Sequence, residues 1–359
     1  MDYRLDPDAF TATLEALDRR RWLFEQLPVD PVHLEWFRHR AWVRTVHGTT
    51  KIEGNTLSEV EVEELLAGTY PRVSRKEALE VLGSRDAIQF VDDIAVRTEV
   101  PIDEAVVRET HRRVLGDIDA MLTPGEYRRG ENRVIGADGQ TIFTTPPSGD
   151  VPERMRAFGA WLREGADGLP APLAAAVAHL EFVAIHPFND GNGRTARALA
   201  RLLLARGDLG FGGLISLDGQ LDHERDTYFA AIAKSTGRRY APPYDATPFV
   251  EYFVGAAQRA TDHALARMRG LGQVLLAIRR PIVSGHLPAP MLDGLAYAWI
   301  NGSIRPSDYA SVTGRDRAAA TRDLGIASRL GYLEPHGATR TRRYTVAEAL
   351  SSLAPIPEA

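Results

Sequence analysis

The chain has 359 residues, of which 44% are hydrophobic and 25% charged, a composition typical of globular proteins rather than of disordered, fibrous or membrane ones. Its formal net charge of -5 disfavours bulk electrostatic coating of nucleic acid, although a local basic patch is compatible with it. The sequence has no cysteine, which excludes disulfides, thiolate nucleophiles, iron–sulfur clusters and cysteine-ligated zinc.

The N-terminus lacks a basic start followed by an apolar run, so it does not resemble a secretory signal. No stretch reaches the roughly 18 uninterrupted apolar residues that a membrane span needs. We therefore expect a soluble protein of the cytoplasm that does not enter a membrane. A chain of this length exceeds one hydrophobic core, so we expect about two or three domains.

Apolar residues at helical spacing dominate the first 270 residues and predict a mainly α bundle. The segment 134–143 places β-forming residues on both sides of Asp138 and Gly139, which predicts a short hairpin that Pro146 and Pro147 end. The predicted helices cover residues 8–25, 31–48, 58–67, 75–97, 103–115, 150–163, 172–186, 193–206, 222–235 and 247–270.

The pattern changes after about residue 280, where the Pro- and Gly-containing stretch 281–290 predicts a linker. We therefore expect a helical N-terminal region over 1–110, a core over 111–270 and a separate C-terminal domain over 281–359.

The loop 186–192, between two predicted helices, combines several groups suited to phosphate chemistry. Pro187 disfavours helical geometry at His186, and Gly191 and Gly193 allow the backbone to wrap around a ligand. A helix begins near Arg194, and unpaired N–H groups at a helix start attract anions. Arg194 and Arg197 lie three residues apart on one helix face and can hold a polyphosphate.

The polar side chains of the loop each suit one task in nucleotidyl transfer. His186 can accept the proton of an attacking hydroxyl, because the ordinary pKa of histidine lies near 6.5. Asp190 offers a hard oxygen ligand for Mg²⁺, and Asn192 and the glycine amides can contact phosphate. Each feature alone has an ordinary explanation as a turn, a loop residue or a solvated helix face. Their coincidence within twelve residues favours the functional interpretation.

The stretch His186-Pro187-Phe188-Asn189-Asp190-Gly191-Asn192-Gly193-Arg194-Thr195-Ala196-Arg197 resembles the signature of the Fic (Fic/Doc) family, with every fixed position matched. The resemblance covers roughly residues 30–265. It implies a Fic-type helical bundle that transfers AMP from ATP, with Mg²⁺, to a Ser, Thr or Tyr hydroxyl of a target protein. It further implies the roles that follow: His186 as base, Phe188 as anchor of the loop, Asp190 as metal ligand, Asn192 and the amides of residues 191–195 at the α- and β-phosphates, Arg194 at the γ-phosphate and Arg197 at the β-phosphate.

Three other segments fit the same resemblance. The predicted hairpin resembles the family's flap, which pairs with an extended segment of the target. Tyr228 and Phe229 resemble an aromatic pair beside the adenine, although such a pair on a helix also suits a core. His179 has no further metal ligands in view, which favours a packed histidine over a metal site.

The segment Thr49-Thr50-Lys51-Ile52-Glu53-Gly54 resembles the family's inhibitory motif, with Thr49, Glu53 and Gly54 in the matching places. The resemblance implies that Glu53 pairs with Arg194 and so keeps ATP in an unproductive pose. Without it, the segment would simply be a helix end with a Gly cap.

The C-terminal domain resembles a winged helix-turn-helix, a unit that can bind DNA, recognise a protein or dimerise a chain. Residues 300–345 contain eight Arg and four acidic residues, so this region is mildly basic. DNA binding, homodimerisation and self-modification all stay open.

Two other functions compete with AMP transfer. With Glu53 orienting a water, the same loop would remove AMP from a modified protein or transfer another phosphate-containing group. Alternatively, the chain is a DNA-binding regulator whose bundle senses nucleotide, although sensing needs no base at His186. A P-loop ATPase is disfavoured because no Gly-x-x-x-x-Gly-Lys-Ser/Thr motif occurs.

Overall fold

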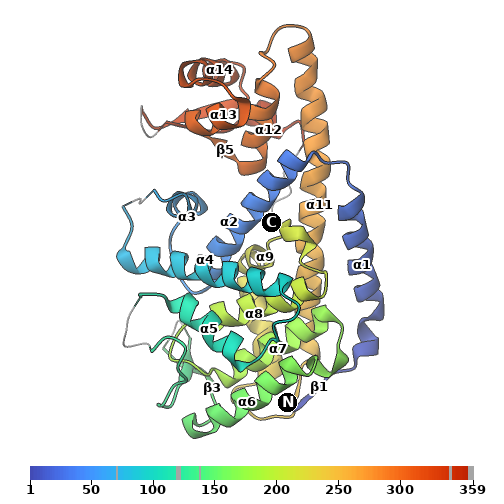
Figure 1. The fold of residues 1–359 in the computed structure, drawn as a ribbon, viewed down its shortest axis with the longest axis vertical. Helices are drawn as coiled ribbons and strands as arrows, with labels where there is room; N and C mark the ends of the chain where they lie inside the picture. The colour runs from blue at the N-terminus through green and yellow to red at the C-terminus, as the bar shows by residue number, and fades with distance from the viewer. Residues whose placement is uncertain (70–71, 119–122, 137–138, 339–341, 355–359) are drawn as a thin grey trace. The chain divides into compact units, whose positions relative to one another are not determined.

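The computed structural model describes residues 1–69, 72–118, 123–136, 139–338 and 342–354. They form two compact units (Figure 1). Unit 1 contains Met1–Glu25 and Trp42–Ala260, and unit 2 contains Gln26–Ala41 and Thr261–Ala359. Two helices, α2 (Pro31–Ile52) and α11 (Thr247–Val283), contribute residues to both units. No described helix is both long enough and apolar enough to cross a bilayer.

Unit 1 is almost entirely helical, as the sequence predicts. Its short strands are β1 (Tyr3–Arg4) with β4 (Tyr244–Asp245), and β2 (Arg133–Ile135) with β3 (Thr141–Thr144). Besides the two shared helices, its helices are α1 (Thr11–Gln26), α3 (Glu59–Leu66), α4 (Arg75–Val96), α5 (Glu104–Leu115), α6 (Val151–Arg163), α7 (Ala171–Ile185), α8 (Asn192–Arg206), α9 (Leu217–His223) and α10 (Arg225–Thr236). Single 3-10 turns lie at Pro7–Phe10, Ser148–Asp150, Ala166–Gly168 and Phe211–Gly213.

Helix α7 is the centre of unit 1. Apart from His179 and Glu181, it is apolar and buried on all sides, which is the pattern of a helix surrounded by others. It packs against α6, α8 and α10, and α8 in turn packs on α4 and α5 (Figure 1). The loop 186–191 that joins α7 to α8 is therefore carried by the two best-packed helices of the unit.

The predicted hairpin is confirmed. Strands β2 and β3 are antiparallel, with Val134 opposite Phe143 and a register irregularity after it. The tip residues 137–138, where the sequence places an Asp before Gly139, lie outside the described residues.

The predicted helices are found, with differences at some boundaries. The helix expected over 222–235 is two helices, α9 and α10, separated at Glu224. Helix α11 continues well past the expected end at residue 270 and through Pro281. Gly270 does not break it, because this glycine instead lets the helix approach the ring of Trp299. The predicted linker is thereby shortened to the residues after Val283.

Unit 2 contains α12 (Met291–Asn301), β5 (Ser303–Ile304), α13 (Pro306–Thr313), α14 (Arg317–Arg329), β6 (Leu333–His336), β7 (Arg343–Val346) and α15 (Glu348–Ser351). The three strands form one antiparallel sheet in the order β5-β7-β6. Trp299 and Tyr309 fill its core, each no more than 1% exposed.

Close packing of α4 on α5 predicts a specific destabilisation. A Cβ at Gly83 would clash with the carbonyl oxygen of Val114, so Gly83→Ala should lower the free energy of unfolding by about 1–3 kcal/mol, as overpacking does. Gly272→Ala on α11 is the control, because nothing lies within 4 Å of its Cβ position. It should be neutral or stabilising by up to about 1 kcal/mol. Equal chemical-denaturation midpoints for both variants would contradict the close approach of α4 and α5.

Candidate active site

His186 lies at the end of α7 with its backbone in the left-handed region, φ 51° and ψ 59°, and its N–H donates to Phe182 O. The ring nitrogen Nδ1 lies 3.2 Å from the carbonyl oxygen of Val183, which can only accept a hydrogen bond. Nδ1 therefore carries the proton and Nε2 is left with a free lone pair. Burial lowers the pKa of His186 below its ordinary value of 6.5, partly opposed by the Val183 carbonyl. The ring is thus a neutral base at pH 7.

Arg128 fixes the backbone around His186, a role that sequence reasoning missed. Its side chain is 2% exposed and donates to His186 O at 2.9 Å and to Pro146 O at 2.6 Å. Its own N–H donates to Pro187 O. One buried guanidinium thereby connects the start of the loop to the segment that follows the hairpin.

The loop is closed by its own side chains. Phe188 is 0% exposed, as expected for an anchor. Its N–H donates to Asn192 Oδ1 at 3.0 Å, and Asn192 Nδ2 donates back to Phe188 O at 2.9 Å. The side chain of Asn192 therefore closes the turn in this structure, and its contact with phosphate remains a prediction.

His111 of α5 packs against the same loop, and sequence reasoning missed this residue as well. Its ring stacks on Phe188 with centroids 3.5 Å apart and planes 1° from parallel. Nδ1 accepts from Gly125 N–H, so Nε2 carries the proton and donates to Asp190 O at 3.0 Å. Burial lowers the pKa of His111 to about 4, so the ring stays neutral in this tautomer.

Helix α8 begins directly after the loop and points its free N–H groups at it. Gly191 adopts φ 72°, and a Cβ there would press on Val114 and Leu115 of α5. Thr195 Oγ1 donates to Gly191 O at 2.8 Å, so its hydroxyl holds the first turn of the helix. The N–H groups of the first turn remain for an anion.

Asp190 is the carboxylate that could hold a metal. Its side chain is 49% exposed, with Oδ1 accepting from Gly191 N–H and Oδ2 3.7 Å from Arg194 Nη2. Within the described chain, no cluster of three or more His, Asp or Glu side chains could chelate a metal by itself. A single accessible carboxylate fits Mg²⁺, which takes its other ligands from phosphate and water.

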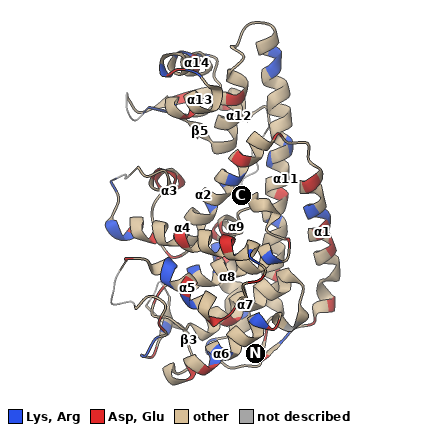
Figure 2. Cartoon of the chain, in the orientation of Figure 1, with Lys and Arg blue, Asp and Glu red and all other residues tan. Residues whose placement is uncertain are grey.

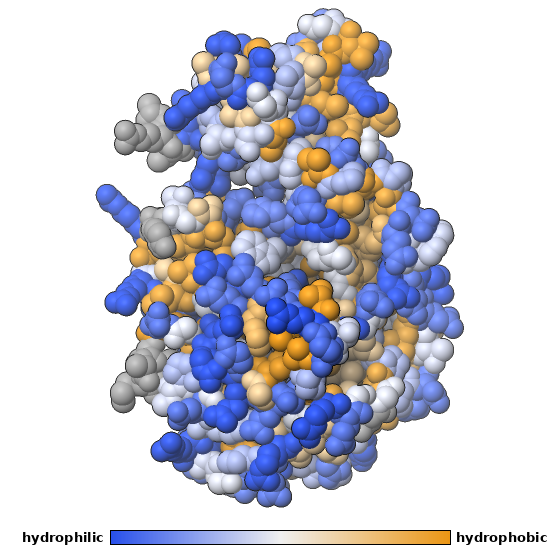
Figure 3. Space-filling view, in the orientation of Figure 1, coloured by the Kyte–Doolittle hydropathy of each residue, from blue (hydrophilic) through white to orange (hydrophobic). Residues whose placement is uncertain are grey.

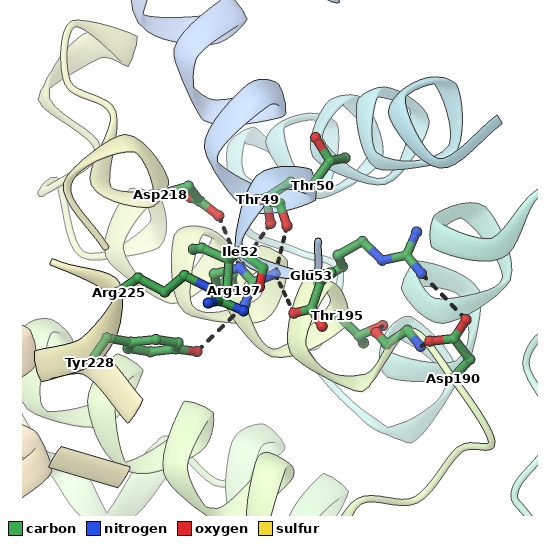
Figure 4. A network of polar contacts seen from close by, with 12 residues as sticks. Thr49, Thr50, Ile52, Glu53, Asp190, Thr195, Arg197, Asp218, Arg225 and Tyr228 are labelled. Carbon is green, nitrogen blue, oxygen red and sulfur yellow. Dashed lines mark hydrogen bonds and ion pairs between the residues drawn. The ribbon is translucent and has the colours of Figure 1, made fainter. Parts of the chain in front are cut away.

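Glu53 pairs with Arg197 and not with Arg194, so the expected partner was wrong. Glu53 Oε1 lies 2.8 Å from Arg197 Nη2 (Figure 4). Arg194 is 4% exposed, and its Nη2 lies 3.7 Å from Asp190 Oδ2 instead. The two arginines therefore have different carboxylate partners, Asp190 for Arg194 and Glu53 for Arg197. The sequence places both arginines on one helix face and cannot show this difference.

The carboxylate of Glu53 also lies over the start of α8. A Cβ on Gly193 would clash with Glu53 Oε1 in its observed position, so a side chain there would displace the carboxylate. The Glu53 oxygens therefore stand where an anion of a ligand would meet the helix N-terminus and Arg197. Gly54, at φ 97°, ends α2 directly after this contact.

Arg197 is 3% exposed and is held by more than Glu53. Thr49 accepts from it twice at 2.8 Å, through Oγ1 and its carbonyl oxygen, and Asp218 Oδ1 lies 3.4 Å from Nε. Burial raises the pKa of Asp218, and the charge of Arg197 opposes this shift. Burial lowers the pKa of Arg197, but Glu53, Tyr228 and Asp218 raise it above its ordinary value. The guanidinium is therefore always charged.

Tyr228 and Phe229 of α10 differ in exposure. Tyr228 is 1% exposed, receives a long hydrogen bond of 3.5 Å from Arg197 Nη1 and lies 2.9 Å from His179 Nε2. Phe229 is 41% exposed. His179 is fully buried, and burial lowers its pKa to about 3, which agrees with the expected packed histidine. The adenine contact of both aromatic side chains stays a prediction.

Comparison with known proteins agrees with this site. Residues 101–204 match the model of the Fic/DOC family. The curated "Protein adenylyltransferase Fic" of Aedes aegypti is 31% identical over 252 residues, covering 69% of this chain and 46% of that protein. Its counterpart in Nematostella vectensis is 28% identical over 257 residues, with 70% and 56% covered. The chain thus spans about half the length of the curated relatives it matches.

Solved structures with similar folds include a Fic domain containing signaling protein from Bacteroides thetaiotaomicron, with TM-score 0.61 and 25% identity over 72% of this chain and 97% of that one. Fic-1 from C. elegans gives TM-score 0.59 and 27% identity, with 72% of each chain covered. A Fic family protein from Desulfovibrio desulfuricans shares the fold over 96% of this chain, at TM-score 0.59 and 23% identity. Together with the loop that joins α7 to α8, these matches show that residues 101–204 form a domain of the Fic/DOC family.

Proposed function

We propose that this chain is a protein adenylyltransferase, which transfers AMP from ATP to a hydroxyl of a target protein. The observation that supports this most directly is the arrangement at the start of α8. A neutral imidazole with a free Nε2 stands beside an anion site made of helix N–H groups and Arg197. The names of the curated relatives support the same activity.

In the proposed reaction the target hydroxyl forms a bond to the α-phosphorus while the bond from that phosphorus to the β-phosphate oxygen breaks. Nε2 of His186 takes the hydroxyl proton, and pyrophosphate leaves. Arg194, Arg197 and the N–H groups of α8 would hold the phosphates, so most of the rate comes from positioning and charge stabilisation. Mg²⁺ at Asp190 would neutralise charge on the leaving pyrophosphate.

The hairpin would bind the target. Ile135 on β2 and Ile142 on β3 are 53% and 50% exposed, unusual for large apolar side chains. Within the described residues, β2 pairs with β3 alone, so its outer edge is available to an extended segment of the target. The chain itself is one candidate target, and a second copy of the chain, in a homodimer, is one candidate partner.

We further propose that Glu53 inhibits the reaction. Its carboxylate occupies Arg197 and the start of α8, where the phosphates of ATP would bind productively. Removal of AMP from a modified target remains the alternative activity of the same site, with Glu53 orienting a water.

We also propose that unit 2 carries a winged helix-turn-helix. The chain order α12-β5-α13-α14-β6-β7, with the sheet order β5-β7-β6, supports this assignment. In this assignment α13 and α14 form the helix-turn-helix pair, and β6 and β7 form the wing.

His186→Ala should lower AMP incorporation by about 10²–10⁴-fold, the usual contribution of a positioned base. Protein labelling from α-³²P-ATP and from γ-³²P-ATP, with and without a candidate target, measures it. Label retained only from the α position is expected, whereas retention from the γ position would indicate a kinase.

Because burial lowers the pKa of His186, the acid limb of the pH–rate profile should lie below pH 6.5. A limb above pH 6.5 would contradict His186 as the titrating base.

Glu53→Gly and Glu53→Gln should both raise AMP transfer. Hydrogen bonds to charged groups are worth about 1.5–3 kcal/mol. Because Glu53 is 39% exposed, we expect the lower end, an increase of about tenfold. Glu61→Gln, which weakens the capping box of α3, is the control and should alter stability alone. Unchanged labelling by both Glu53 variants would refute the inhibitory role while leaving the transfer activity untouched.

Asp218→Asn tests how Arg197 is held once Glu53 is gone. Combined with Glu53→Gly, it leaves Arg197 without a carboxylate, so we expect KM for ATP to rise about tenfold over Glu53→Gly alone. Asp92→Asn, likewise combined with Glu53→Gly, is the matched control, because Asp92 pairs with Arg201, one turn further along α8. It should lower the melting temperature without changing KM. Equal KM values for the two double variants would show that Asp218 does not position Arg197.

A further inference from the structure

Strand β2 has one face toward the loop that joins α7 to α8 and the other toward solvent. Side chains alternate between the two faces along a strand, and the exposure of β2 alternates in the same way. Asn132, directly before the strand, and Val134 are partly buried, and Asn132 Nδ2 donates to Phe188 O in a long hydrogen bond of 3.5 Å. Arg133 and Ile135 are exposed and therefore lie on the outward face.

Two arginines lie in one row across this outward face. Thr144 of β3 is directly opposite Arg133. On its other side Thr144 forms a parallel bridge with Arg239, in the segment after α10. All three side chains are exposed. Residues directly opposite one another point to the same face, and strands lie about 4.8 Å apart, so the two arginines stand about 10 Å apart with a small threonine between them.

The arginines of this row have no acidic partner among the residues that the structure describes. Glu131 is the acidic residue closest to Arg133 in the chain, and its carboxylate accepts from Ser148 N–H and Oγ, each at 3.1 Å. Figure 2 shows Lys and Arg positions on and beside the hairpin, at the lower left of the view, and Figure 3 shows mainly hydrophilic surface there. The outward face of the hairpin is therefore basic, although the net charge of the chain is -5.

A target strand on the outer edge of β2 would extend this row by one residue. The target residue opposite Arg133 would point to the same outward face, with the two Cβ atoms about 4.5–5.5 Å apart. Its two neighbours in the target would point to the other face, toward the loop that holds His186. An acceptor hydroxyl on that inner face therefore belongs to a residue next to the one that meets Arg133.

We propose that Arg133 selects targets with an acidic residue directly beside the residue that receives AMP. The inference rests on the proposed function, because it requires the target to pair with β2. An acceptor opposite Val134 would have its other neighbour opposite Ile135, which is 53% exposed and favours an apolar side chain there. Arg239, two strands from β2, would add a weaker attraction that salt screens first. The substrate class is an extended segment whose acceptor stands between an acidic and an apolar residue.

The test uses the full chain and four short peptides that differ only beside a central Thr: Glu-Thr-Ile, Ile-Thr-Glu, Lys-Thr-Ile and Ile-Thr-Lys. The two orders allow for a target strand parallel or antiparallel to β2. Labelling from α-³²P-ATP at low salt gives kcat/KM for each peptide. In one of the two orders, the Glu peptide should exceed its Lys counterpart about five- to tenfold, because opposite charges across two strands attract and like charges repel.

Reversing the charge of the arginine separates selection from a structural role. Arg133→Glu should reverse the preference, so that the Lys peptide becomes the better substrate, and Arg133→Lys should keep the original preference. Arg75→Glu is the matched control, because it reverses an exposed charge in the first turn of α4, outside the hairpin. It should leave the preference unchanged.

Equal kcat/KM for Glu and Lys peptides in both orders would overturn the inference and leave AMP transfer intact, and so would a Glu preference that survives Arg133→Glu. If no peptide is labelled, fluorescence anisotropy of the same peptides measures binding without chemistry. A Glu preference in binding that Arg133→Glu reverses would support the selection even where the proposed transfer fails. Binding without that preference, or no binding, would overturn it.

Discussion

The guanidinium of Arg197 is the group on which the rest of the site depends. It is buried, permanently charged and surrounded by acceptors from three helices, α2, α9 and α10. A buried cation must be paired, because an unpaired charge in the interior costs several kcal/mol. Glu53 is the most exposed of its acidic partners, at 39%, whereas Asp218 is 9% exposed. The partner that can leave is therefore the one whose carboxylate stands where a phosphate would bind.

The loop between α7 and α8 is shaped by residues that carry no charge into the reaction. Each of three side chains donates a hydrogen bond to a backbone carbonyl oxygen of the loop: His111 to Asp190 O, Asn192 to Phe188 O and Arg128 to His186 O. Because Gly191 has no Cβ, the loop can pack closely on α5. Because Gly193 has none, the carboxylate of Glu53 can lie close to the start of α8. The chemistry assigned to His186 and Asp190 rests on these supporting side chains.

Much of this could be predicted from the sequence. The helical periodicity and the turn signals were sufficient for the bundle and the hairpin, because both follow from local patterns. The length of α11 was missed because glycine and proline were interpreted as helix breaks. In the structure the helix continues, and Gly270 packs on Trp299, a residue distant in the sequence. At the site, the motif identified the residues but not their partners. The contact between Glu53 and Arg197 joins residues 144 apart in the sequence, so local patterns do not predict it. His111 and Arg128 likewise lie far from the loop in sequence.

The paired hydrogen bonds between Phe188 and Asn192 have a consequence for how tightly a nucleotide can be held. A loop that must become ordered when its ligand arrives loses conformational entropy at that moment, roughly 1–2 kcal/mol for each residue fixed. Here the turn is already rigid through its own side chains, so that loss occurs during folding instead. Even a small, highly charged molecule that offers little apolar surface can then be bound with useful affinity, because the cradle needs no further ordering.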